Sequence, residues 1–215
     1  MRGTLVFADA RADTVERLGA SARSVSSDAG DYVFRRGDSA DALVVVRRGI
    51  VQIVRPAEVP VTLGIFGPRE SIGLAAMLDR SSFPADAIAA SRLETVRIPA
   101  VLVLAAMDDD AGFVRSVNRA LLAHTRALQT KIDLLTAGEV SARLSLLLGH
   151  LAERFGDETE DGSTWVPVGL SRADLSRLVG ARPETVIRVM SRWQKAGALE
   201  TTDEGFRLVD RGALV

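Results

Sequence analysis

The stretch LSRADLSRLVGARPETVIRVMSRWQKAGAL, residues 170–199, decides the fold of the second half of this chain. Its pattern is typical of two short helices joined by a tight turn. Ser171 can cap the first helix, and Asp174 answers it three residues later in a variant of the capping box. Gly180 breaks the helical pattern, and Pro183 suits the first turn of the next helix because its missing N–H would be unpaired there anyway. The stretch therefore predicts a helix pair with its turn near Gly180.

The second of these helices has two chemically different faces. Four apolar residues recur at three- and four-residue spacing and predict a buried face: Val186, Val189, Met190 and Trp193. The opposite face carries Glu184, Ile187, Arg188 and Ser191. An arginine can donate two hydrogen bonds to guanine, a carboxylate can accept one from cytosine N4, and an apolar side chain can contact the thymine methyl group. We therefore predict that Glu184, Ile187 and Arg188 read bases in the major groove of DNA.

The charge around this helix favours the nucleic-acid interpretation over a simpler one. Glu184 and Arg188 stand four residues apart, which is also the spacing of an ordinary solvated salt bridge. The segment, however, collects six cations in a chain whose formal net charge is −1: Arg172, Arg177, Arg182, Arg188, Arg192 and Lys195. Asp174 and Glu184 oppose them, which leaves an excess of four positive charges. Neutralising DNA phosphates is the simplest use for that excess.

The same residues carry a resemblance to a known family. Arg182, Glu184, Thr185, Val186 and Arg188 resemble the recognition helix of the Crp/Fnr family of bacterial transcription regulators, which commonly reads R-x-E-T-V-x-R. The resemblance implies a winged helix-turn-helix over residues 138–215 that binds double-stranded DNA. Pro183 and Ile187 depart from residues found in some relatives, so the DNA site need not match the familiar consensus sequences.

The wing of this domain is expected as a hairpin. Residues 199–201 and 206–209 can pair around a turn in which Gly205 supplies the left-handed residue. Arg207 on this wing is either a phosphate contact or a lone solvated arginine. The full set of expected phosphate contacts is Ser171, Arg172, Arg182, Thr185, Arg192, Lys195 and Arg207.

The first half of the chain has strand-like spacing after a short amphipathic helix expected at residues 10–18. Short β-rich runs occur near residue 25 and at 32–34, 42–47, 50–54, 61–65, 85–89 and 95–98, with Gly30, Gly37 and Gly49 at expected chain reversals. Residues 29–54 also resemble the cyclic-nucleotide-binding β-roll. We therefore predict an α+β protein whose residues 1–109 form an antiparallel, jelly-roll-like sensory domain.

The ligand site of that roll departs from the pattern of relatives that bind cyclic AMP. The resemblance implies a Gly-Glu pair that holds the ribose and a later Arg-Ser pair that neutralises the phosphate. Here Leu74 follows Gly73, and Phe83 replaces the arginine. Without that arginine, a bound phosphate would lose its hydration and gain no positive charge to offset the cost. We therefore expect no tight cyclic-nucleotide binding. Arg80 is either a substitute cation or an exposed loop arginine. The candidate effector pocket comprises Gly73, Leu74, Phe83, Pro84, Ala85 and Gln129, and it holds an unknown small molecule or is degenerate.

A long helix is expected over residues 112–135, within a segment 110–137 that separates the two domains. Its residues repeat at spacings of four and three, a seam suited to a two-stranded coiled coil: Val117, Leu121, His124, Leu128, Ile132 and Leu135. We therefore expect a homodimer that binds a near-palindromic DNA site. His124 is interpreted as a packed interface residue rather than a pH sensor. RNA polymerase is a candidate further partner, although no motif identifies a surface for it.

The composition excludes several other functions. The chain has no cysteine, and its two histidines, His124 and His150, lack ligand-spaced companions, so we expect no metal and no cofactor. No nucleophile with a triad partner and no phosphate loop is present, so we expect no enzyme. Without a signal-like or membrane-length apolar run, the expectation is a cytoplasmic protein with no membrane partner. The alternative that stays open is a small-molecule sensor whose winged helix mediates protein contacts.

Overall fold

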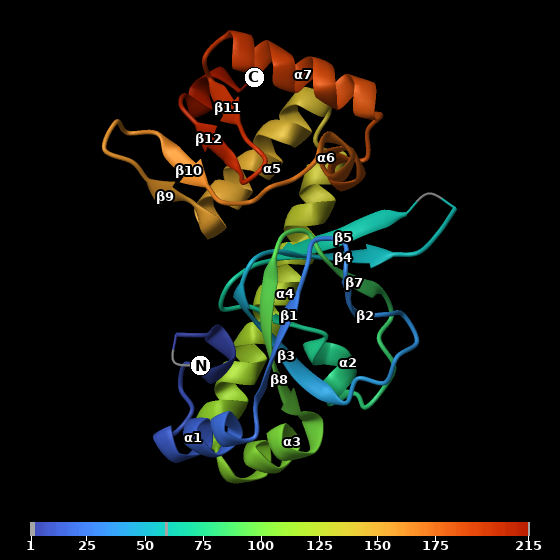
Figure 1. The fold of residues 1–215 in the computed structure, drawn as a ribbon, viewed down its shortest axis with the longest axis vertical. Helices are drawn as coiled ribbons and strands as arrows, with labels where there is room; N and C mark the ends of the chain where they lie inside the picture. The colour runs from blue at the N-terminus through green and yellow to red at the C-terminus, as the bar shows by residue number, and fades with distance from the viewer. Residues whose placement is uncertain (1–2, 59, 215) are drawn as a thin grey trace. The chain divides into compact units, whose positions relative to one another are not determined.

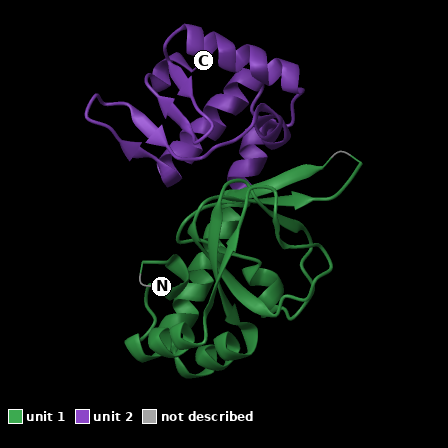
Figure 2. Cartoon of the chain, in the orientation of Figure 1, with its two compact units in different colours: residues 1–128 green, residues 129–215 purple. Residues whose placement is uncertain are grey.

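The computed structural model describes residues 3–58 and 60–214, and the chain divides into two compact units. Figure 2 shows these units, Met1–Leu128 and Gln129–Val215, in different colours. The boundary falls within the long helix α4 (Ala111–Thr136), so the segment 110–137 contributes to both units. The predicted α+β class is confirmed, with a strand-rich first unit and a helix-rich second unit that ends in a small sheet (Figure 1).

Two antiparallel four-stranded sheets form the β-roll of the first unit (Figure 1). One sheet has the order β1 (Arg23–Ser27), β8 (Leu93–Pro99), β3 (Ala42–Arg48) and β6 (Ser71–Ile72). The other has the order β2 (Tyr32–Phe34), β7 (Asp86–Ala89), β4 (Val51–Arg55) and β5 (Val61–Phe66). Every run predicted as a strand is confirmed. Strand β6 was not predicted, because two residues are too few to show an alternating pattern.

Short helices complete the first unit. They are η1 (Leu5–Phe7), α1 (Ala12–Ala20), α2 (Leu74–Leu78) and α3 (Ala100–Asp109). The helix expected at residues 10–18 begins two residues later, after Arg11, whose backbone is extended. Helix α3 was not predicted, because its sequence AVLVLAAMDD is apolar on nearly every side and lacks an amphipathic repeat.

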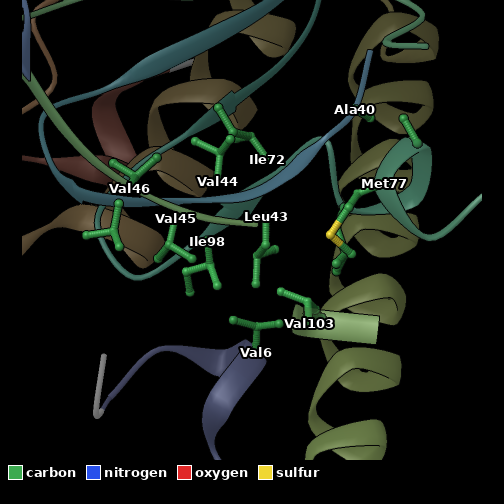
Figure 3. Close-up of a cluster of buried hydrophobic side chains, with 14 of the residues drawn as sticks. Val6, Ala40, Leu43, Val44, Val45, Val46, Ile72, Met77, Ile98 and Val103 are labelled. Carbon is green, nitrogen blue, oxygen red and sulfur yellow. The ribbon is translucent and has the colours of Figure 1, made fainter. Parts of the chain in front are cut away.

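The core of the first unit forms on strand β3. All residues from Ala42 to Val46 are buried, since both faces of this strand are covered and its apolar run is continuous rather than alternating. Figure 3 shows Leu43 and Ile98, from paired strands, lying against Val103 of α3 and Val6 of the N-terminal segment. This packing attaches the N-terminal segment and α3 to the sheet.

Asp110 fastens the N-terminal segment to the start of α4. Its carboxylate accepts the backbone N–H of Arg11 at 2.8 Å and that of Phe113 at 3.0 Å. Burial acts to raise the pKa of Asp110, but these hydrogen bonds, with smaller contributions from Thr14 and the Arg11 charge, outweigh it and lower the pKa to about 2. The ionised carboxylate is therefore the form that the native structure prefers.

Replacing Asp110 with asparagine is expected to lower the free energy of unfolding at pH 7 by about 2 kcal/mol, the linkage value of the pKa difference. Because the native pKa lies below the unfolded value, this stability is present above the unfolded pKa of 3.8 and is lost as pH falls toward about 2. Urea unfolding between pH 7 and pH 2.5, followed by circular dichroism, measures both effects. Asp109→Asn, at the exposed neighbouring position, is the control. If the difference in the free energy of unfolding between the wild type and Asp110→Asn stays constant down to pH 2.5, this account is wrong.

The second unit contains the last turns of α4 and three further helices, α5 (Val140–Phe155), α6 (Arg172–Val179) and α7 (Pro183–Lys195). A sheet of order β11 (Leu199–Thr201), β12 (Phe206–Leu208), β10 (Thr164–Val166) and β9 (Asp157–Glu158) completes it, followed by η2 (Arg211–Ala213). Helix α5 is amphipathic, and its buried face includes Leu144, Leu147, Leu148 and Leu151. Of the acidic residues 157–161, the first two form β9 and the rest turn back toward β10.

Candidate nucleic-acid interface

The turn between α6 and α7 is formed by the local interactions that the sequence predicts. The Ser171 hydroxyl accepts the N–H of Asp174 at 3.1 Å, and the Asp174 carboxylate accepts the N–H of Ser171 at 2.9 Å. Both halves of the predicted capping box are therefore present. Gly180 ends α6 with φ 63°, a left-handed conformation that suits glycine, and Pro183 begins α7. The helix pair is confirmed with its turn at the predicted glycine.

Helix α7 presents one buried and one exposed face, as predicted. The buried residues are Val186, Val189, Met190 and Trp193. Glu184 and Arg188 are exposed on the opposite face, and Ile187 between them is 48 % exposed. Among the residues that the structure describes, Glu184 forms no ion pair with Arg188. An acid, an apolar side chain and a guanidinium are therefore presented together to solvent.

Several expected phosphate contacts are already engaged within the protein. The Arg172 guanidinium donates to the Thr201 hydroxyl at 3.0 Å, and burial lowers the pKa of this half-buried Arg172. Gln194 donates to the same hydroxyl at 3.0 Å. Thr201, which the sequence analysis missed, thus joins the start of α6, the end of α7 and the wing. Arg177 pairs with Asp174 at 2.5 Å, so this arginine is not among the cations left for DNA.

Arg207 on the wing lies between two acids. Its guanidinium contacts the Asp161 carboxylate at 3.2 Å and that of Glu200, its neighbour across the hairpin, at 3.8 Å. Hydrogen bonds from Thr159 and Ser163, together with the Arg207 charge, lower the pKa of Asp161. These contacts favour a structural role for Arg207 over a phosphate contact. The cations exposed on or beside α7 are Arg182, Arg188, Arg192 and Lys195.

The wing hairpin is confirmed, but the role expected for Gly205 was wrong. Gly205 does not have a positive φ, so it does not supply a left-handed turn residue. A Cβ atom at this position would instead come within 2.2 Å of the Val166 carbonyl oxygen. Glycine is required because β10 approaches the backbone closely there. The Thr202 hydroxyl closes the turn by accepting the N–H groups of Glu204 and Gly205, each at 3.2 Å.

An aromatic ring fills the candidate effector pocket of the first unit. The buried ring of Phe83 stacks on Phe34 with centroids 3.7 Å apart. A Cβ atom at Gly73 would meet the Phe83 ring at 2.3 Å, which shows how tightly the ring covers this glycine. Leu74 and Ala85 are also buried beside it. The structure therefore brings together four members of the candidate effector pocket as apolar core.

The remaining two members of that pocket are not part of this buried core. Pro84 is exposed, and Gln129 is exposed on α4 within the second unit. Arg80, the substitute cation considered above, is an exposed residue with φ 52° just after α2. The exposed-loop interpretation of Arg80 therefore fits its surroundings.

The residues of the predicted dimer seam divide into two groups along α4. Val117 is fully buried within its own unit, and Leu121 packs against the same core, so both serve intrachain packing. The His124 ring lies edge-on to Phe66 at 5.2 Å. Leu128, Ile132 and Leu135 are 55 %, 61 % and 42 % exposed. Val117 is thus not available to a partner helix, whereas Leu128, Ile132 and Leu135 are exposed and available to one.

Two further cations, which were not predicted as site residues, contact the backbone at the C-terminal end of α6. Lys131 of α4 donates to the carbonyl oxygen of Leu178, and Arg143 of α5 donates to that of Val179 at 3.0 Å. Their positions in the sequence offered no signal, because the acceptors are backbone atoms more than thirty residues away.

The comparisons with known proteins agree with this architecture. The cyclic nucleotide-binding domain matches residues 24–110, and the Crp-like helix-turn-helix domain matches residues 142–215. Transcriptional activator protein anr of Pseudomonas aeruginosa is 25 % identical over 184 residues, which cover 84 % of this chain and 74 % of that protein. The CRP-like cAMP-activated global transcriptional regulator of Mycobacterium tuberculosis is 24 % identical over 194 residues, covering 89 % of this chain and 86 % of that protein.

A solved structure shows the same fold. FixK2 from Bradyrhizobium japonicum superposes with a TM-score of 0.78 at 18 % identity, covering 90 % of this chain and 95 % of that one. Both curated relatives are transcription regulators. None of the helices in residues 3–58 and 60–214 has the combined length and apolarity needed to cross a bilayer.

Proposed function

The chain belongs to the Crp/Fnr family of transcription regulators, and from that premise we propose that it is a homodimer that binds a near-palindromic DNA site through α7. The exposed face of α7 is the observation that carries this proposal. Arg188 would donate two hydrogen bonds to a guanine, Glu184 would accept from a cytosine, and Ile187 would contact a thymine methyl group. The buried face opposite holds these side chains on a rigid element.

Contacts with the DNA backbone would come from residues around this face. Arg182, Arg192 and Lys195 are exposed, and Thr185 is half-buried near the start of α7. Ser171 lies at the start of α6, where the backbone N–H groups and the helix dipole favour an anion. Arg172 and Arg207 would contribute less, since Arg172 is half-buried and Arg207 lies beside the carboxylates of Asp161 and Glu200. Phosphate contacts position the protein and make its affinity depend on salt.

Dimerisation would use the exposed apolar residues of α4. Leu128, Ile132 and Leu135 recur at spacings of four and three, and Leu122 is a further exposed leucine, at 58 %, on the same helix. A lone exposed leucine needs no explanation, but a stripe of them on one helix is typical of a surface that a partner covers. Two copies would then present two copies of α7 to successive turns of DNA.

The effector is proposed not to be a cyclic nucleotide. Phe83 occupies the place of the phosphate-binding arginine, and its ring is stacked and buried. We expect isothermal titration with cyclic AMP to show no binding at micromolar concentration, because an unpaired phosphate would have to displace apolar core. Binding in that range would contradict this interpretation of Phe83 and Leu74.

The DNA-binding proposal is tested with a duplex selected from a random library by the full-length protein. Fluorescence anisotropy at several salt concentrations should show binding that weakens steeply with salt and prefers the selected duplex at least roughly 1,000-fold over random sequence. Binding without sequence preference would instead favour the alternative, a sensor whose winged helix contacts proteins.

A further inference from the structure

The C-terminus of α6 is held by two cations that come from neighbouring helices. The Lys131 ammonium donates to the carbonyl oxygen of Leu178. The Arg143 guanidinium donates to the carbonyl oxygens of Val179 at 3.0 Å and Gly180 at 3.4 Å. The last carbonyls of a helix lack partners within it and carry the negative end of its dipole, so cations stabilise them. Here these carbonyls lead directly into the turn before α7.

The same contacts reach the junction between α4 and α5. Arg143 also donates twice to the Gly138 carbonyl oxygen, from Nε at 3.3 Å and from Nη2 at 3.1 Å. Gly138 lies between α4 and α5, so a single guanidinium joins that junction to the helix-turn-helix turn. Leu135 of α4 adds an apolar contact, because a Cβ atom at Gly180 would lie 3.2 Å from its Cδ2. The turn is thus attached to the end of α4 by three side chains.

Lys131 is an unusual choice of residue in this chain. The sequence contains 25 arginines and two lysines, Lys131 and Lys195. Lys131 is half-buried, and burial lowers its pKa to about 8. Burying an ammonium costs free energy, so this charge is a poor means of stabilising the fold. Its hydrogen bond to Leu178 instead fixes where α6 ends relative to α4.

We propose that Lys131 and Arg143 are positioning residues for DNA recognition, which together with Leu135 attach the α6–α7 turn to the end of α4. This inference rests on the proposed function. The residues Leu128 and Ile132, through which two copies would pair, lie on the same helix as Lys131. Fixing the turn to that helix fixes the separation of the two copies of α7, and therefore the spacing of the two DNA half-sites. Lys131 and Arg143 touch no base in this arrangement.

The test measures spacing preference with the full-length dimer. Duplexes carry the two selected half-sites with the selected spacer, or with a spacer one base pair longer or shorter. Lys131→Met keeps the aliphatic stem and removes the ammonium. We expect it to bind the selected duplex roughly tenfold more weakly, to lose most of the preference for its spacer, and to keep the salt dependence of the wild type.

The second lysine offers a matched control. Lys195→Met removes an exposed ammonium beside the base-reading face, so it should weaken binding to all spacers alike and reduce the slope of log affinity against log salt by about 1. Lys131→Arg should keep the spacing preference that Lys131→Met loses, since arginine can also donate a hydrogen bond to the Leu178 carbonyl oxygen. Thermal unfolding should show Lys131→Met at least as stable as the wild type, because a desolvated charge has been replaced by an apolar side chain.

Three results would overturn the proposal. One is an unchanged spacer preference in both Lys131→Met and Arg143→Met. Another is an equal loss on all duplexes with a smaller salt slope, which would make Lys131 a phosphate contact. A third is no faster amide hydrogen exchange over residues 176–186 in Lys131→Met, measured without DNA. If the wild type itself shows no sequence preference, the proposed function fails, and the exchange measurement still tests the attachment of the turn.

Discussion

Replacing Ile132 with glutamate is expected to convert the proposed dimer into a monomer. Ile132 is 61 % exposed at the centre of the stripe that also contains Leu128 and Leu135. In a symmetric pair each change enters the interface twice, which places two unpaired carboxylates in an apolar seam. Leaving one buried charge unpaired costs about 3 to 5 kcal/mol, enough to dissociate a dimer of ordinary stability. Sedimentation velocity across a range of protein concentrations measures the change.

The same substitution should weaken specific DNA binding at least about 100-fold, because each half-site would then be bound without the gain from linking two binding events. Leu146→Glu is the control. Leu146 is a leucine of α5 that is 52 % exposed and lies outside the stripe, so this variant should stay dimeric and bind DNA normally. If Ile132→Glu stays dimeric at micromolar concentration, the stripe on α4 is not the interface.

Replacing Arg188 with alanine is expected to cost about 1 to 3 kcal/mol on the selected duplex, which is roughly a 5- to 150-fold loss of affinity. The guanidinium is the strongest candidate for a bidentate contact with guanine, and no other residue of the exposed face can replace both hydrogen bonds. Binding to random DNA should change much less. Anisotropy titrations on both duplexes at the same salt concentration measure the difference.

A finer readout uses duplexes with single base-pair changes in the half-site. Arg188→Ala should lose discrimination at one G·C pair and keep it at the others. Arg192→Ala, one turn further along α7, should weaken binding to all of these duplexes alike if it contacts phosphate. An equal loss by Arg188→Ala on the selected and the random duplex would make Arg188 a phosphate contact as well.

The parts of the fold that the sequence predicted are those with local causes. The capping box of Ser171 and Asp174, the left-handed Gly180 and the apolar repeat of α7 all act within a few residues, and the structure reproduces them. Strands of five or more residues also followed from their spacing. Helix α3 and strand β6 did not, because one lacks an amphipathic repeat and the other is too short to have any.

Features that depend on distant partners were the ones that sequence reasoning missed or misjudged. Gly205 is required by the approach of Val166, not by its own turn. Arg207 is neutralised in part by Asp161, 46 residues away. Val117 repeats like a dimer residue, yet the roll of its own unit buries it. In each case the role of the residue depends on a neighbour that is distant in the sequence but close in the folded structure.

The sequence by itself determined the helices and strands that have a clear periodic pattern, the amphipathic character of α7, and the presence of Glu184, Ile187 and Arg188 on one face. Hydrogen bonds between near neighbours and the periods of helix and strand are sufficient for that. Only the tertiary structure decided that Phe83 fills the roll beside Gly73, that Val117 of the α4 seam is buried within its own unit, and that Lys131 and Arg143 hold the end of α6. These depend on packing and on backbone carbonyls brought close by the fold, and neither has a signature in the order of the residues.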